Sequence, residues 1–407
     1  MSRRRWGAGA VVRTTYIAIP QAAETHAVLL SRPFWIWGAE IGVNEHGVAI
    51  GNEAVHPRST PQRREALIGM DLVRLGVERG ATAEAAVGVM IELLERHGQG
   101  GSCGHLRRRW YDNSFIVADA KEIFVVETVG RHWAVSRTRG VRTISNTYTI
   151  STDCSAASPT AERFARGAGF WQGDGFDFAE AMTDPHNAAL AMARGRCARS
   201  TARLNALTGR LDAAAMIAVL RDHGEDGERD GWHPEDIAGP SATICMHAGD
   251  RGRSGQTAGS LVADLRDGAA VHWTTGTAAP CTGVFKPVFL DAGLPDAGLQ
   301  PGDRYDTATL WWRHEMLHRA MLRDAGVWTP YATERDALER SFLARAESAL
   351  AADAAERRRV SERCWLEANE AEQRWLEDLQ ARNVPPARRR AFLRSWDLHD
   401  RLAGLVA

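Results

Sequence analysis

The sequence has almost no lysine, no closely spaced cysteines and no long apolar run. Lys121 and Lys286 are the only lysines, and arginine makes up the rest of the 50 basic residues, which nearly balance 51 acidic ones. A formal net charge of −1 gives the chain no overall field that would attract nucleic acid or an anionic membrane surface. We therefore expect neither of these as a partner.

The six cysteines are scattered along the chain, and no two of them have the CxxC spacing. This pattern argues against a disulfide framework or a thiolate zinc site, and it favours a reducing compartment. No apolar run approaches the roughly 18 residues that a membrane span needs, and no signal-peptide core follows the basic start. These absences predict a soluble, cytoplasmic protein with no cofactor and no metal.

The first two thirds of the chain show helix and strand periodicities in alternation. Ile68, Leu72 and Leu75 recur at helical spacing, and a second helix is expected between an N-cap at Thr82 and an end at Gly98. Apolar and β-branched runs predict strands over 114–118, 123–128, 142–150 and 242–247. With 407 residues, 44% of them hydrophobic, the chain can bury a sizeable core.

The last third of the chain has a different character. Beyond Asp291, helices are predicted over 310–322, 334–350, 360–379 and 387–402. Strands in one block and helices in another are typical of the α+β class. We predict a disordered or frayed terminus over 1–13, a mixed domain over 14–290 and a helical C-terminal region over 291–407.

The segment from Phe34 to Val55 carries the first candidate chemistry. Two apolar runs flank residues 44–47 (NEHG), whose Asn and Gly suit a tight turn between strands. The second run ends in Asn52 and Glu53, which places a carboxamide and a carboxylate at a strand terminus. A side-chain amide there can donate to a developing oxyanion. An ordinary hairpin would show the same residues.

Seven strings of the sequence occur in the order that one known family would have them. They are WIWGAEIGVNEHGVAIGNEA, ALIGMDLVRLGVERGATAEAA, LLERHGQGGSC, NSFIVADAKEIFVVETVGRHWA, ISNTYTI, ATICMHAGD and VHWTTGTAAPCTGVFKPV. In this order they resemble the secernin and C69 dipeptidase family. The resemblance covers roughly residues 14–290, and it extends more loosely into the helical tail through LWWRHEMLHR.

This resemblance implies an N-terminal-nucleophile hydrolase that acts on dipeptides or small amides. The implied fold is an αββα sandwich, with two antiparallel sheets between layers of helices. In that family a cysteine at the mature N-terminus attacks the amide carbon, and its own α-amine is the general base. The ordinary pKa of an α-amine is about 8 and that of a thiol is about 8.5, so the two groups can exchange a proton near neutrality.

The chain departs from the family where the nucleophile strand is expected. It begins with MSRRRWGAGAVVR, and its first cysteine is Cys103, which has no α-amine to work with. Three explanations stay open: a start assigned too late, an N-terminally truncated and inactive relative, or another nucleophile such as Ser2. The DNA upstream of the Met1 codon would distinguish the first two.

Two asparagines match the positions of family site residues. By resemblance, Asn52 is the oxyanion-hole asparagine and Asn146 is the asparagine that holds the amine of the nucleophile. Each could instead be a strand-end amide that ties down a neighbouring loop. Asn44 is expected to shape the turn, and Asn113 to act as a cap or turn residue.

Scattered cysteines and histidines offer further chemistry. Cys245 and His247 stand two apart on a predicted strand and would face the same side, either as a reactive pair or as a buried thiol beside a satisfied histidine. Cys103 would be reactive if a cation from residues 107–109 (RRR) lowered its pKa.

The segment His314-Glu315-Met316-Leu317-His318 matches the HExxH pattern of zinc hydrolases. On a helix this pattern places two imidazoles one turn apart with a glutamate as base, and Glu334 or Glu339 could provide a third ligand. The pattern also arises by chance, and the apolar residues around it fit a packing helix.

The leading hypothesis is thus a secernin-like relative of the cysteine-type hydrolases, with a small peptide or amide as substrate. An inactive binding scaffold is the second hypothesis, and a zinc hydrolase that uses His314 and His318 is a minor third. A missing first strand would leave a sheet edge open, so we also expect low solubility or a homo-oligomer.

Overall fold

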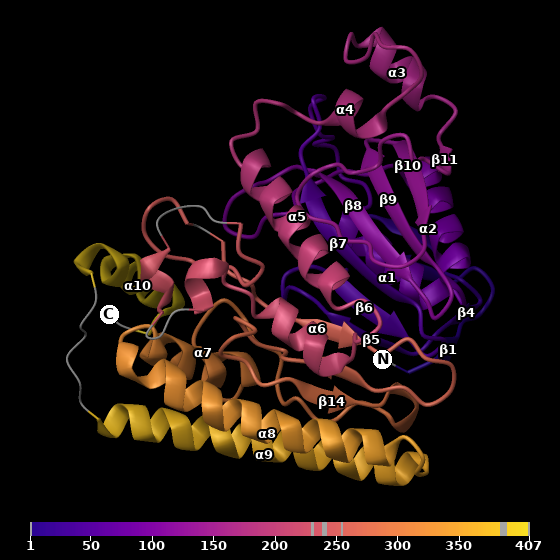
Figure 1. Cartoon of the computed structure of the whole chain (residues 1–407). Helices are drawn as coiled ribbons and strands as arrows, with labels where there is room; N and C mark the ends of the chain where they lie inside the picture. Colours follow the sequence, from indigo (N-terminus) through magenta and orange to yellow (C-terminus); the bar gives the residue numbers. More distant parts are fainter. Residues whose placement is uncertain (1, 229–231, 238–241, 254, 383–388, 406–407) are drawn as a thin grey trace. The chain divides into compact units, whose positions relative to one another are not determined.

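The computed structural model describes residues 2–228, 232–237, 242–253, 255–382 and 389–405. The chain forms two compact units (Figure 1): unit 1 contains residues 1–205 and 265–268, and unit 2 contains residues 206–264 and 269–407. Both units contain helices and strands, which confirms the predicted α+β class. The predicted domain boundary at 290 differs from this division, because it falls inside unit 2.

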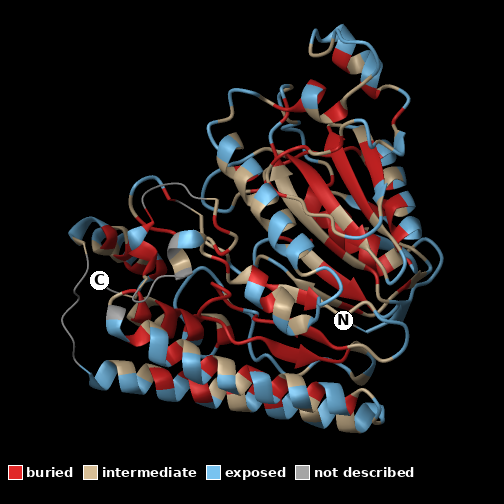
Figure 2. Cartoon of the chain, viewed as in Figure 1, coloured by how far each residue is buried: buried red, intermediate tan, exposed pale blue. Residues whose placement is uncertain are grey.

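Unit 1 is built on a seven-stranded antiparallel sheet in which neighbours in the sequence are neighbours in space, in the order β11-β10-β9-β8-β7-β6-β5. Its strands are β5 (Val28–Ser31), β6 (Ile41–Asn44), β7 (Ala49–Val55), β8 (Asp112–Ala118), β9 (Ile123–Val129), β10 (His132–Thr138) and β11 (Ala156–Ala157). Figure 2 shows that much of this sheet is buried. The hairpin predicted between residues 114 and 128 is confirmed as β8 and β9.

Two short two-stranded ribbons precede the sheet. They pair β1 (Arg4–Arg5) with β4 (Glu24–Thr25), and β2 (Val11–Arg13) with β3 (Ala18–Pro20). The prediction of a frayed terminus over 1–13 therefore differs from the structure, in which two stretches of that segment are hydrogen-bonded strands.

The two helices predicted after the first hairpin are confirmed as α1 (Gly69–Arg79) and α2 (Ala83–His97). Thr82 is the N-cap of α2, since its hydroxyl accepts the backbone N–H of Ala85, and α2 ends at Gly98, whose φ is +75°. Their apolar stripes pack with one face of the sheet in a single hydrophobic cluster.

A second cluster covers the opposite face of the same sheet. Because side chains alternate along a strand, Val126 of β9 belongs to the α1–α2 cluster and Val125 belongs to the second one. That second cluster contains residues of α3 (Ala161–Gly167) and α4 (Phe178–Met182). The next helix in the chain is α5 (Leu190–Ala206).

The strand predicted over 142–150 is wrong, because these residues hold only an isolated bridge in the structure. The buried Glu127 carboxylate accepts the backbone N–H groups of Thr149 and Ile150, at 2.6 and 3.0 Å. A β-ladder would need the same two N–H donors. The Glu127 side chain therefore takes the place of the strand carbonyls that would accept them.

Unit 2 combines a small antiparallel sheet, in the order β12-β13-β14, with five α-helices among its described residues. Its elements are α6 (Ala213–Leu220), β12 (Leu261–Ala263), β13 (His272–Thr274), β14 (Lys286–Val288), α7 (Leu310–Met321), α8 (Trp328–Ala349), α9 (Ala354–Ala381) and α10 (Arg390–Ala403). Residues 242–247, predicted as a strand, lie in an irregular segment. In the part of the chain that the structure describes, no helix has both the length and the apolar character of a membrane span.

Candidate functional site

Asn52 and Glu53 lie in the middle of β7, which pairs with β8 along its whole length, so the strand does not end at these residues as the sequence suggested. Asn52 stands opposite Phe115 and Glu53 stands opposite Ser114. Because consecutive strand residues face opposite sides, the two side chains point to different faces of the sheet. Asn52 contacts Met70 of α1, whereas Glu53 accepts a hydrogen bond from Asn146.

The structure therefore separates the two predicted site asparagines. Asn52 belongs to the face of the sheet that α1 covers, and Asn146 is bound to the opposite face through Glu53. The two side chains are not in contact with each other. The roles that the family resemblance assigns to them stay predictions.

A directed chain of side-chain amides begins at Asn52. Its Nδ2 donates to Asn113 Oδ1 at 2.7 Å, Asn113 Nδ2 donates to Gln99 Oε1 at 2.8 Å, and Gln99 Nε2 donates to Asp112 Oδ1 at 2.6 Å. An ionised carboxylate can only accept, so Asp112 fixes the direction of the whole chain. We call these four residues the amide relay.

The relay determines which polar atom of Asn52 is free. The amide nitrogen is engaged by Asn113 and lies 3.6 Å from the sulfur of Met70. The Oδ1 atom of Asn52 is buried and has no hydrogen-bond partner among the described residues. Asn52 thus presents an acceptor, which suits an ammonium or hydroxyl donor; stabilisation of an oxyanion would require the amide to give up the weak Met70 contact.

Asn146 is fully engaged by its neighbours. Its Nδ2 donates to Glu53 Oε2 at 2.9 Å and to the carbonyl of Ala54 at 3.0 Å, and its Oδ1 accepts from Arg196 of α5 at 2.7 Å. These contacts tie the loop to β7, as the alternative interpretation of the sequence predicts. Burial raises the pKa of Glu53 to about 7, and Arg196 lowers it less than burial raises it.

Asn113 is not the cap or turn residue that the sequence suggested, because it lies inside β8 and forms the centre of the amide relay. Asn44, in contrast, shapes the predicted turn. Its Oδ1 accepts the backbone N–H groups of His46 and Val48, and its Nδ2 donates to two carbonyls at the end of α1.

Cys103 is buried in a small apolar cluster with Met70. Burial raises the pKa of its thiol to about 12, so the reactive thiolate is scarce at neutral pH. The arginines at 107–109 are exposed and do not reverse this effect. The structure therefore favours a packing role for Cys103.

A cavity of about 640 Å³ lies at the far end of the amide relay, and Gln99 and Asp112 form part of its wall. Its lining also includes Arg64, Arg131 and His132. This part of unit 1 combines space for a small ligand with basic side chains. The relay thus extends from the wall of this cavity to the middle of β7.

The predicted HExxH helix is confirmed as α7. Both ring nitrogens of each of its two histidines contact other protein groups. His314 contacts the carboxylate of Glu372 through Nδ1 and the carbonyl of Ala278 through Nε2, at 3.1 and 3.0 Å. Both partners are acceptors, so His314 satisfies them as an imidazolium; burial lowers its pKa, but Glu372 outweighs this effect and raises it. An imidazolium has no lone pair for a metal.

His318 and Glu315 are also engaged elsewhere. His318 Nε2 lies 2.9 Å from the amide of Gln256 and its Nδ1 lies 3.0 Å from the hydroxyl of Thr282. Glu315 forms an ion pair with Arg319 at 2.9 Å. The motif therefore packs α7 against its surroundings, and the geometry does not favour the zinc-hydrolase hypothesis.

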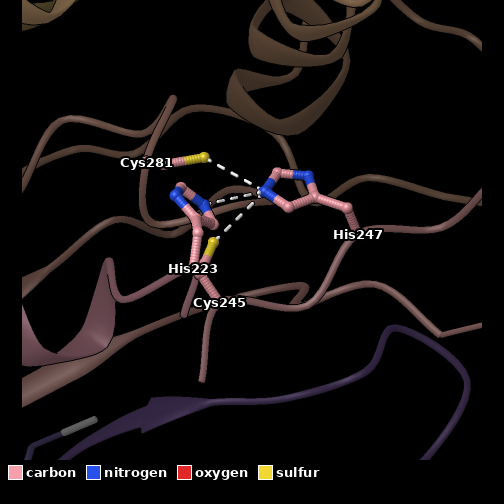
Figure 3. A group of neighbouring side chains, drawn as sticks. All are labelled: His223, Cys245, His247 and Cys281. Carbon is pink, nitrogen blue, oxygen red and sulfur yellow. Dashed lines mark hydrogen bonds between the residues drawn. The ribbon is translucent and has the colours of Figure 1, made fainter. Parts of the chain in front are cut away.

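A different group of metal-binding side chains meets in unit 2, close to this helix (Figure 3). We call it the Cys–His cluster; its members are His223, Cys245, His247 and Cys281. Their candidate ligand atoms all lie within 4.8 Å of one another. Three of the four side chains are buried and His223 is half-buried, with the ring of Trp232 stacked on it at 3.9 Å between centroids.

The two thiols of the cluster differ in acidity. Burial raises the pKa of Cys245 well above its usual value. Burial also opposes ionisation of Cys281, but the hydrogen bond from Cys245 and the neighbouring imidazoles outweigh it and lower the pKa of Cys281. Cys281 is thus the more acidic of the two thiols.

Sequence reasoning found half of this cluster. The spacing of Cys245 and His247 indicated a pair on one side, and the sulfur lies 3.4 Å from His247 Nε2. His223 and Cys281 were missed because they lie 24 and 34 residues away from His247 in the sequence. No short motif links such distant residues, so only the fold brings them together.

Comparison with the known protein families finds none that matches the chain.

Proposed function

We propose that the chain is a secernin-like relative of the cysteine-type N-terminal-nucleophile hydrolases, and that its reaction class is the hydrolysis of dipeptides or small amides. The proposal starts from the ordered strings that resemble the family. The structure is of the mixed α+β class. The αββα sandwich typical of these hydrolases is part of the proposal.

The observation that carries the proposal is the unpartnered acceptor of Asn52 in the middle of β7. A buried carbonyl oxygen without a donor costs about 1–3 kcal/mol of stability, so a ligand, a catalytic partner or a water is expected to complete it. The group that would complete it is a donor such as the α-ammonium of an N-terminal nucleophile or of a bound dipeptide. The amide relay holds Asn52 in the orientation that presents this oxygen.

The cavity beside the relay supports a small substrate. Its volume of about 640 Å³ lies in the usual range for small-molecule sites. Arg64 and Arg131 in its lining suit a free carboxylate, which a dipeptide has and a longer internal peptide segment lacks.

A second function, ligand binding without catalysis, is favoured by the state of the unit 1 side chains. Asn146 has both amide hydrogens engaged, and Cys103 is held as a thiol. In this state Asn146 has no free hydrogen for the amine of a nucleophile, and Cys103 is a poor nucleophile. In this alternative the cavity binds the small peptide or amide, Asn52 acts on it only through the amide relay, and no bond is broken.

Hydrolysis of a panel of dipeptides and N-acyl amides by the purified 407-residue protein tests the proposal. The Asn52→Ala variant should lose about 10- to 100-fold of the rate, because it removes the acceptor for an α-ammonium, and a hydrogen bond to a charged group contributes about 1.5–3 kcal/mol. The control is Asn205→Ala, since Asn205 is exposed on α5. Absence of turnover in the wild type would contradict the hydrolase, and equal turnover in the wild type and Asn52→Ala would contradict the role of Asn52.

The binding alternative predicts a different result in the same proteins. Dipeptides would raise the melting temperature of the wild type and of Asn205→Ala, but not of Asn52→Ala, and no amide would be cleaved. If turnover is seen, single Cys→Ala replacements test the thiol mechanism, which activity in all six variants would exclude.

A further inference from the structure

The Cys–His cluster contains a contact pattern that hydrogen bonds alone cannot explain. Three atoms approach the same nitrogen, His247 Nε2: His223 Nε2 at 3.1 Å, Cys245 Sγ at 3.4 Å and Cys281 Sγ at 3.4 Å. Figure 3 shows the three contacts converging on this atom. An imidazole nitrogen has either one hydrogen or one lone pair, so it can satisfy one of these neighbours and not three.

The same distances fit four ligands around one ion. Zn–N bonds of about 2.0 Å and Zn–S bonds of about 2.3 Å place the ligand atoms of a tetrahedron roughly 3.3–3.8 Å apart. The observed contacts of 3.1 to 3.4 Å are within a few tenths of an ångström of that range. An ion at the centre would need only a small outward movement of each side chain.

We propose that unit 2 binds one Zn²⁺ through the four side chains of the Cys–His cluster. Two thiolates and two neutral imidazoles form a donor set that is typical of tetrahedral zinc and unsuited to Mg²⁺ or Ca²⁺. The charges also balance: Zn²⁺ replaces the thiol protons, which pass to solvent, and the complex with two thiolates is neutral. A neutral complex suits a site in which three of the four ligands are buried.

The backbone around the cluster is held in place by buried polar contacts. Arg221, two residues before His223, donates to the carbonyls of Pro280 and Gly283 at 2.8 and 3.1 Å, and its guanidinium forms a bidentate pair with Glu339. The backbone N–H of Cys245 donates to the carbonyl of Asp222 at 3.0 Å. These contacts position all three ligand-bearing segments before a metal arrives.

The site is structural in character and separate from the proposed hydrolase. All four positions of a tetrahedron are filled by the protein, which leaves no open position for a water or substrate. The one half-buried ligand, His223, is where an ion could enter or leave. His247 Nδ1 has no hydrogen-bond partner among the described residues, so the affinity should be below that of sites whose histidines are held by such a partner.

Elemental mass spectrometry measures the metal content of the full-length protein, which is purified without an affinity tag and without a chelator. We expect one zinc per chain, and X-ray absorption should show two sulfur and two nitrogen ligands. The Cys281→Ser and His223→Asn variants should lose more affinity than the roughly 10- to 100-fold that loss of an outer partner costs. Cys364→Ser is the matched control, since Cys364 is buried on α9 outside the cluster.

A second measurement avoids variants that fail to fold. Co²⁺ added to the zinc-depleted wild type should give the charge-transfer absorption of cobalt–thiolate bonds and should raise the melting temperature. Metal-free protein that shows neither change would overturn the proposal. So would zinc-free protein whose peptide map shows a Cys245–Cys281 disulfide, or a zinc content that both cluster variants retain.

Discussion

At the scale of single residues, the strand that carries Asn52 could be predicted, but its place in the strand and its partners could not. The apolar run stops at Asn52, which suggested a strand end, yet β7 continues to Val55. The partner Asn113 lies 61 residues away, and Gln99 precedes a separate strand, so no local pattern indicates that three amides and a carboxylate line up. The orientation of Asn52 depends on that distant carboxylate. Because the sequence does not show this dependence, the sequence alone favoured a donor role for the amide of Asn52.

The buried Glu53 should make stability depend on pH. Its pKa is raised to about 7 in the folded chain, whereas an unfolded glutamate titrates near about 4.3. The folded state therefore binds more protons between those values, and this group's contribution to the free energy of unfolding falls as the pH rises from about 4.3 to 7. The expected loss is on the order of 3–4 kcal/mol, because the two pKa values differ by roughly 2.7 units at about 1.4 kcal/mol per unit.

The Glu53→Gln variant isolates this contribution, because its amide oxygen can still accept from Asn146 and it does not titrate. Urea unfolding at pH 5 and pH 8 should show a larger loss of stability in the wild type than in the variant. Equal losses in the two proteins would mean that Glu53 keeps an ordinary pKa.

At the scale of elements, local signals predicted α1, α2 and the β8–β9 hairpin well. Thr82 and Gly98 mark the two ends of α2 by cap chemistry that depends on a few neighbouring residues. The prediction failed over 142–150, where the competing acceptor is the side chain of Glu127 on another strand. Local periodicity cannot reveal a side chain that takes up the backbone donors of a distant segment.

The start of α1 depends on the absence of a side chain at Gly69. A Cβ there would lie 2.1 Å from the side chain of Asn113, whereas a Cβ at Gly88 in α2 would meet nothing within 4 Å. We expect Gly69→Ala to displace the amide relay and to cost about 1–3 kcal/mol, as overpacking does. Gly88→Ala should stabilise the protein by up to about 1 kcal/mol, since alanine favours the helix.

Chemical unfolding of the two variants measures this difference. If Gly69→Ala is as stable as Gly88→Ala, the relay can move aside at little cost. In that case Asn52 is not held as firmly as the hydrogen-bond geometry implies.

At the scale of the whole molecule, the chain does not divide where its composition changes. The helical block beyond Asp291 is visible in the sequence, but unit 2 also includes the preceding residues 206–264 and 269–290. The Cys–His cluster lies within those residues, so a boundary at 290 would separate the cluster from the helices of its own unit. Packing of segments that are distant in sequence determines the division, and composition does not report it.

Metal removal should therefore affect the two units differently. Hydrogen exchange of the zinc-loaded protein, measured before and after addition of a chelator, should become faster at residues 222–228, 242–247 and 279–285 of unit 2. Amides of β7, β8 and β9 should keep their protection, because the cluster lies in the other unit. Equal acceleration in both units, or none in either, would contradict a local structural role for zinc.

The direction of the amide relay depends on a single proton. Burial raises the pKa of Asp112 to about 7, and a protonated carboxyl group can donate as well as accept. If Asp112 donated to the oxygen of Gln99, each amide in turn would have to rotate by half a turn to keep its hydrogen bond. Asn52 would then expose its N–H₂ group instead of its oxygen. Protonation of Asp112 in the cavity wall would thus exchange an acceptor for a donor at Asn52, in the middle of β7.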